Sequence, residues 1–128
     1  VGFGRRVLGV FEKYGINFEH MPSGIDSISL IIREKNCPPE KLARILKKYE
    51  QLDADSVTVD QDQAIGMLVG RGMTKTVGVA TRATAAFAKA NINIRMINQG
   101  SSEVSIMFGV EAKDAKPSVV ALYNEFFN

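Results

Sequence analysis

Hydrophobic positions along the chain alternate between helical and strand spacing. The first 33 residues predict a helix that ends at Gly15, a strand over 16–21, a glycine-containing turn and a second strand over 28–32. A second helix is expected from Pro38-Pro39, since proline suits the first turn of a helix. Its apolar residues have helical spacing: Leu42, Ile45, Leu46 and Tyr49. Two more strands are expected over 56–59 and 64–69.

The same order of elements returns in the second half. With an offset of 76 positions, residues 1–33 align with residues 77–109 without a gap, and nine aligned pairs are identical. The predicted copies are a helix over 76–90, a strand over 92–97, a strand through Val104, Ile106 and Phe108, and a helix over 116–127. An offset of 77 aligns the apolar positions of the two later helices. The chain is therefore a tandem repeat.

Each copy follows the order β-α-β-β-α-β, which predicts an α+β fold of two ferredoxin-like units with antiparallel sheets and helices on one face. The expected units are residues 1–62, without a leading strand, and residues 63–128, without a closing strand. We expect segments upstream of Val1 to supply what is missing, so that the chain is a piece of a longer polypeptide.

Composition gives no support to several classes of function but does not identify the function. The 128 residues are 45% hydrophobic and 23% charged, with a net charge of +2, which gives no electrostatic case for binding nucleic acid or an anionic membrane. Apolar runs are too short to span a bilayer, and no signal peptide is visible. A single cysteine, Cys37, fits a reducing, cytoplasmic location.

One glycine-containing run is similar to two known motifs, one for binding nucleotides and one for binding RNA. The run Gly2-Phe3-Gly4 resembles part of a phosphate-binding loop, but Val7 occupies the place of the third glycine. The same run resembles the RNP1 motif of RNA-binding modules with this element order, although RNP1 aromatics lie on a strand and this run opens a helix. An RRM-type RNA-binding module is the alternative hypothesis.

Candidate chemistry for catalysis or metal binding is sparse. His20 and Cys37 each stand alone, and metal sites need clusters of ligands, so no metal site is expected. No nucleophile–base pair is apparent, and therefore no catalytic residue or cofactor is assigned to this chain. The methionines most typical of core positions are Met67, Met96 and Met107.

One pattern suggests a binding site in both copies. Each first helix begins with small residues, Val1-Gly2 and Val77-Gly78, and each following strand carries an asparagine after isoleucine, Asn17 and Asn93. Free N–H groups at a helix start suit a carboxylate, and an asparagine oxygen suits an ammonium group. If two units pack side by side, a zwitterionic amino acid fits between them. The simpler alternative is that the glycines only form turns.

The residues also resemble a known family. The stretch 92–106, with its Asn98-Gln99-Gly100-Ser101-Ser102-Glu103 run, is similar to the second ACT domain of aspartate kinases. Residues 1–15 and 20–26 resemble the first ACT domain of the form common in Gram-positive bacteria, and Leu68–Met73 also fits the family. The resemblance covers essentially the whole chain.

The resemblance implies a regulatory function. The parent polypeptide is expected to be an ATP- and magnesium-dependent aspartate kinase whose kinase domain lies outside this non-catalytic chain. Lysine or threonine, or both, would bind the ACT pair and inhibit that kinase domain, with homodimers formed through ACT domains. A further alternative is an ACT sensor of another amino-acid-pathway enzyme.

The resemblance also implies two sets of effector-binding residues. The first set is Gly2, Phe3, Gly4, Ser23, Asp26, Asn93 and Ile94. The second, pseudo-equivalent set is Val77, Gly78, Asn17, Phe18 and Gln99.

Overall fold

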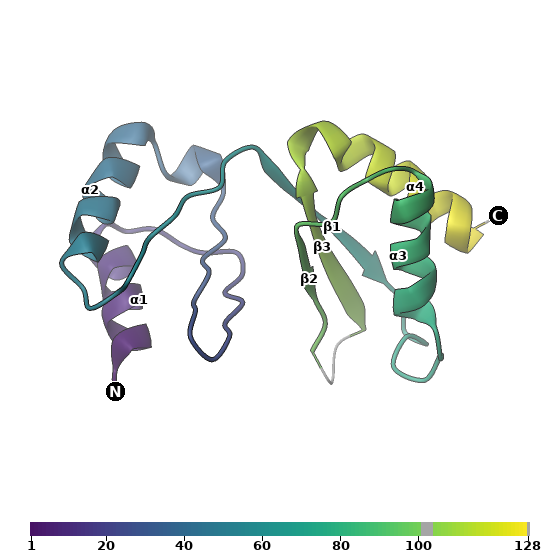
Figure 1. The fold of residues 1–128 in the computed structure, drawn as a ribbon, viewed down its shortest axis with the longest axis horizontal. Helices are drawn as coiled ribbons and strands as arrows, with labels where there is room; N and C mark the ends of the chain where they lie inside the picture. Colours follow the sequence, from purple (N-terminus) through teal and green to yellow (C-terminus); the bar gives the residue numbers. More distant parts are fainter. Residues whose placement is uncertain (101–103, 128) are drawn as a thin grey trace. The chain divides into compact units, whose positions relative to one another are not determined.

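A computed structural model describes residues 1–100 and 104–127 of the chain (Figure 1). The chain forms two compact units, Val1–Val59 (unit 1) and Asp60–Asn128 (unit 2). Each unit has its own hydrophobic core.

Unit 1 is built on two packed helices. Helix α1 spans Phe3–Lys13 and helix α2 spans Pro39–Glu50, and a short 3-10 helix, Glu34–Asn36, precedes α2. Both α-helices carry an apolar stripe, and these stripes contribute to a small core. That core consists of Phe11, Ile16, Cys37 and Ile45, with Val10, Tyr14, Leu30, Ile32, Leu42 and Tyr49 packed around it.

The predicted strands of unit 1 pair only at isolated positions. His20 faces Ile31 and Ser23 faces Ile28 in antiparallel bridges, with the N–H of Ile31 donating to the carbonyl of His20 at 2.9 Å. The strand expected over 56–59 is not formed, so that prediction is wrong. A strand needs neighbours to complete its hydrogen bonds, and within the described part of unit 1 only the two arms of this hairpin pair with each other.

Unit 2 contains a three-stranded antiparallel sheet in the order β1-β3-β2. Its elements are β1 (Gln63–Val69), α3 (Val79–Lys89), β2 (Met96–Asn98), β3 (Ser105–Glu111), a 3-10 helix (Ala112–Asp114) and α4 (Ala115–Phe127). Helix α3 begins three residues later than predicted, because Thr76 belongs to the preceding turn, where its hydroxyl donates to the carbonyl of Gly72 at 2.8 Å.

Both helices of unit 2 lie on one face of the sheet (Figure 1). The core between helices and sheet has eight buried members: Val79, Ala83, Phe87, Ile92, Ile106, Phe108, Val110 and Leu122. The rings of Phe87 and Phe108 meet at its centre, with centroids 4.8 Å apart. The predicted α+β class, with an antiparallel sheet and helices on one face, is confirmed.

The prediction that three methionines occupy core positions is wrong. Met67 is 51% exposed, and Met96 and Met107 are only half-buried. Met67 pairs with Met107 across the sheet, on the face opposite the helices, since neighbouring Leu68 packs against the helix-side core. These side chains therefore form an apolar outer face of the sheet rather than its core.

The repeat is visible in the backbone of both units. Helices α1 and α3 are each 11 residues long, and each begins after a glycine in the left-handed region, Gly2 with φ 79° and Gly78 with φ 87°. Past each helix end, Gly15 and its counterpart Asn91 also have positive φ, 64° and 57°. Equivalent positions therefore adopt equivalent conformations, as a duplicated unit requires.

Candidate functional site

The start of α1 offers backbone donors to a ligand. Gly2 is the N-cap and supplies no side-chain hydrogen bond, so the first N–H groups of the helix, including those of Phe3 and Gly4, have no capping side chain. The first turn contains no acidic residue. The positive end of the helix dipole and these N–H groups favour an anionic group such as a carboxylate.

A hairpin carrying two more candidate residues lies beside this helix start. A Cβ at Gly4 would stand 3.8 Å from Cδ1 of Ile28, and Ile28 is the bridge partner of Ser23. The N–H of Gly24 donates to the carbonyl of Ser27 at 2.8 Å, which closes the hairpin and places Asp26 at its exposed tip. The structure thus brings the helix start and the Ser23 hairpin of unit 1 together.

The last two residues of the first set belong to unit 2. Asn93 is exposed and Ile94 is half-buried against the unit 2 core, just before β2. The following residue fixes this segment, because the N–H of Arg95 donates to the carbonyl of Gly109 at 2.7 Å. The first set therefore divides between the units, with five residues in unit 1 and two in unit 2.

The second set is divided in the opposite sense. Val77 is exposed and Gly78 caps α3 in unit 2, where Gln99 follows β2. Asn17 and Phe18 lie in unit 1 and border a shallow hollow. The other lining residues of that hollow are Leu8, Phe11, Glu12 and Ile16.

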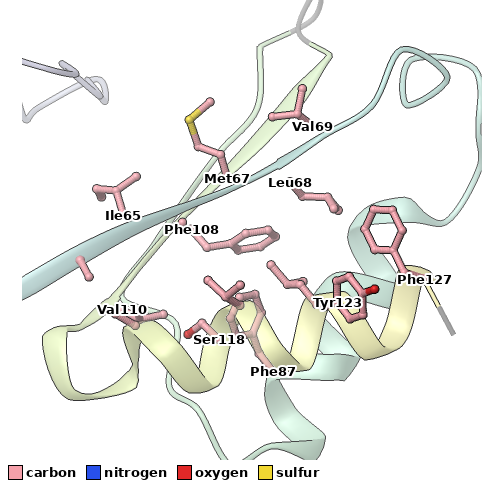
Figure 2. A pocket seen from close by; sticks show the side chains of 15 residues that line it. Ile65, Met67, Leu68, Val69, Phe87, Phe108, Val110, Ser118, Tyr123 and Phe127 are labelled. Carbon is pink, nitrogen blue, oxygen red and sulfur yellow. The ribbon is translucent and has the colours of Figure 1, made fainter.

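The structure also contains a cavity that the sequence analysis missed. A groove of about 350 Å³ lies between α4 and the sheet of unit 2, and Figure 2 shows Phe108 and Leu68 facing Tyr123 and Phe127 across it. All of its lining side chains are uncharged. Its one buried hydroxyl, on Ser118, donates to the carbonyl of Asp114 at 2.6 Å. Such a groove suits apolar side chains and not a zwitterion.

The side chains of unit 1 with shifted pKa values belong to its core. Burial raises the pKa of Tyr49 to about 12, and its hydroxyl donates to the carbonyl of Val7 at 3.1 Å. Burial also raises the pKa of the Cys37 thiol, against the opposing effect of nearby Lys41. A thiol held in its neutral form is a poor nucleophile.

Neither a metal site nor a membrane-spanning helix is found among the described residues. Within 1–100 and 104–127, no three His, Cys, Asp or Glu side chains gather where they could hold a metal ion. No helix in that part of the chain is long and apolar enough to cross a membrane.

Comparison with known proteins decides between the candidate families. The ACT-domain family model matches residues 67–126. A structure described as a C-terminal regulatory domain of aspartate kinase from Porphyromonas gingivalis W83 is 31% identical, with a TM-score of 0.74, and the match covers 98% of this chain and 81% of that one. The chain belongs to the ACT regulatory regions of aspartate kinases.

Two longer aspartate kinases are also similar. Aspartokinase 3 of Bacillus subtilis is 45% identical over 128 residues, which cover 99% of this chain and 28% of the relative. The crystal structure of Clostridium acetobutylicum aspartate kinase is 43% identical, with a TM-score of 0.90, and the match covers 98% of this chain and 29% of that one. This regulatory chain thus spans little more than a quarter of those two proteins.

The RNA-binding alternative gains no support. An RRM-type module needs aromatic side chains on the open face of its sheet. Among the described residues, that face carries Ile65, Met67 and Met107, whereas Phe108 is buried on the helix side.

Proposed function

We propose that this chain is the amino-acid-sensing part of an aspartate kinase, and that lysine or threonine, or both, bind it and lower the activity of the kinase. The observation that carries the proposal is the glycine-capped start of α1 beside the Ser23 hairpin. A structure of Escherichia coli aspartokinase III in complex with lysine and aspartate supports it, since that protein is 25% identical with a TM-score of 0.78.

Each residue of the first set has a role in this proposal. The effector carboxylate accepts hydrogen bonds from N–H groups at Gly2, Phe3 and Gly4, with the hydroxyl of Ser23 nearby. The carboxylate of Asp26 attracts the side-chain ammonium of a lysine. Asn93 and Ile94 of an ACT unit packed alongside complete the site through an amide oxygen and the backbone.

The second set repeats this arrangement. Val77 and Gly78 supply the helix start, Asn17 and Phe18 supply the partner segment, and Gln99 lies at the neighbouring turn.

The remaining functions belong to the longer polypeptide. We propose that its kinase domain, outside residues 1–128, uses ATP and magnesium to phosphorylate the side-chain carboxylate of L-aspartate. ACT units would pair to form a homodimer, and a reducing cytoplasm would suit the single buried thiol of Cys37.

Titration calorimetry on the complete polypeptide tests effector binding. Heat is expected with lysine, with threonine or with both together. Substitution Asn93→Ala should weaken binding about tenfold, because it removes a hydrogen bond to a charged group, and should leave uninhibited kinase activity intact. Asn36→Ala, an exposed asparagine outside both sets, is the matched control. The absence of heat in every titration would refute the effector assignment.

We also propose that the ACT units are 1–62 and 63–128 and that a strand from upstream of Val1 closes the second one. Two observations support this. Strand β1 is at the edge of the sheet, and the apolar groove runs beside it under α4. A strand paired with β1 would cover Val119, which lines the groove and is 63% exposed.

Substitution Val119→Asp tests whether an upstream strand pairs with β1 and covers Val119. In the complete polypeptide it should destabilise the region by at least about 2 kcal/mol, since it buries a charge without a partner. In the 128-residue chain, the same change should have little effect. Thr81→Asp on the exposed surface of α3 is the control. Equal, small effects in both proteins would contradict the closing strand.

A further inference from the structure

The two helix pairs of the repeat differ at one charged position. Arg6 in α1 and Arg82 in α3 are the same residue of the repeat, at an offset of 76. In the second helix of each pair, the offset of 77 makes Lys48 the counterpart of Glu125. The arginine is therefore identical in the two units, whereas the equivalent position of the second helix is a lysine in unit 1 and a glutamate in unit 2.

In unit 2 the arginine joins the two helices through three contacts. Nε of Arg82 donates to Oε1 of Glu125 at 2.9 Å, and a terminal nitrogen of the guanidinium donates to the backbone carbonyl of Glu125 at 2.9 Å. The guanidinium also lies over the ring of Phe126, 4.4 Å from its centroid. Because it is a planar fork, one arginine can hold a carboxylate, a helix-terminal carbonyl and a ring together. We call this set of contacts the Arg82 clamp.

In unit 1 the equivalent arginine has no such role. Among the described residues no carboxylate pairs with Arg6, whose Nη1 donates to the carbonyl of Val1 at 3.4 Å and whose guanidinium lies 5.7 Å from the ring of Phe3. Both of those partners belong to the start of the same helix. The lysine at position 48 has no carboxylate to accept a hydrogen bond from a guanidinium, and so the ion pair of the clamp has no counterpart in unit 1.

Another residue links the helices of unit 1. Tyr49, the counterpart of Phe126, donates one neutral hydrogen bond to the carbonyl of Val7 and stacks against Phe11 with centroids 6.3 Å apart. The clamp is partly exposed, at 50% for the side chain of Arg82 and 37% for that of Glu125, but it joins the helices through two acceptors and a ring, whereas Tyr49 joins them through one neutral hydrogen bond and a ring. The helix pairs are therefore alike in sequence pattern and unlike in how firmly they are joined.

We infer that the Arg82 clamp makes unit 2 the rigid half of the repeat, and that Lys48 leaves α1 and α2 of unit 1 free to shift when an effector binds. This inference rests on the effector-binding function proposed above. A ligand shifts a conformational equilibrium only if the two states differ in affinity for it, and a helix pair without a clamp can adopt a second arrangement at lower cost.

Amide hydrogen exchange in the complete polypeptide tests the inference. In the wild type, amides of α1 should exchange faster than those of α3, and lysine or threonine should slow α1 more than α3. Lys48→Glu supplies the missing carboxylate and should slow α1 about threefold, with a smaller effector-induced change. Arg82→Met keeps the apolar stem and removes the charge, so it should speed exchange in α3 by about the same factor.

Lys47→Glu is the matched control, because it makes the same charge change on the exposed surface of the same helix. Equal exchange in α1 and α3 of the wild type would overturn the inference, as would equal effects of Lys48→Glu and Lys47→Glu. If neither amino acid binds the wild type, the effector function fails, whereas the comparison of α1 with α3 in the free protein still decides the rigidity of the two units.

Discussion

The two units start from one hydrophobic pattern and complete it to different degrees. In unit 2, β3 has a neighbour on each side and its inward residues, Ile106, Phe108 and Val110, are each 1% exposed. In unit 1, the counterparts Leu30 and Ile32 lie in a bare hairpin and are half-buried. Helices α1 and α3 are nevertheless equally long. Helices depend on local signals, whereas a sheet depends on partners.

The largest test of this comparison is the central phenylalanine of each unit. Phe87→Ala should cost about 3–5 kcal/mol, because Phe87 is 1% exposed and packs against Phe108 in the larger core. Phe11→Ala should cost less, since the core of unit 1 is smaller and can relax around the gap. Urea unfolding monitored by circular dichroism would measure both. A larger loss in unit 1 would reverse the comparison.

The glycine caps should behave alike in both units. Gly2→Ala and Gly78→Ala each place a Cβ in the left-handed region, which should cost about 1–2 kcal/mol. Clash is not the cause, since no backbone atom outside the neighbouring residues lies within 4 Å of either added Cβ. Gly9→Ala, in the middle of α1 with open space around it, should be neutral or stabilising. Thermal unfolding of the three variants would show whether the caps are equivalent.

Tyr49 should make the stability of unit 1 depend on pH in the alkaline range. The pKa of Tyr49 rises to about 12 in the folded state against about 10 in an unfolded chain, so stability is fully present below pH 10 and falls as the pH rises towards 12. Tyr49→Phe should remove this dependence and cost about 1 kcal/mol at neutral pH through the lost hydrogen bond to Val7.

Phe126 occupies the same place in unit 2 and is the natural reference for the tyrosine. Chemical unfolding at pH 8 and pH 11 measures the effect. An unchanged pH dependence in the Tyr49→Phe variant would show that another group titrates.

The smallest effect is expected on the outer face of the unit 2 sheet. Met67→Thr should change the stability of the 128-residue chain by less than about 0.5 kcal/mol, because this side chain is 51% exposed and threonine suits a strand. Leu68→Ala, one residue further on the helix side, should cost about 2 kcal/mol. Similar losses would mean that both faces of β1 are buried.

The helices could be predicted from the sequence because their signals are local. Gly15 and the Pro38-Pro39 pair marked helix boundaries that the structure has within a few residues. The strand predicted over 56–59 failed because alternating Val57 and Val59 indicate a strand only where a partner is available. The repeat itself was recognisable, since identical residues recur at a fixed offset.

The orientation of β1 and the apolar groove could not be predicted from the sequence. Both faces of β1 are apolar, so alternation does not tell whether Met67 or Leu68 faces the helices. In α4, apolar residues occur around much of the helix, as Val119, Val120 and Tyr123 show, and no single buried stripe stands out. Asn93 and Ile94 were assigned to the site only through the family resemblance, because their proposed role depends on how two units pair.

The edge position of β1 has a practical consequence for handling this region as an isolated protein. The segment 64–69 is uncharged and lacks proline, and its outer strand edge has unpaired N–H and C=O groups. Such an edge recruits strands from other molecules, so aggregation should increase as the protein concentration rises. A lysine in place of Ile65, which is 41% exposed, would act as a gatekeeper against aggregation without touching the helix-side core.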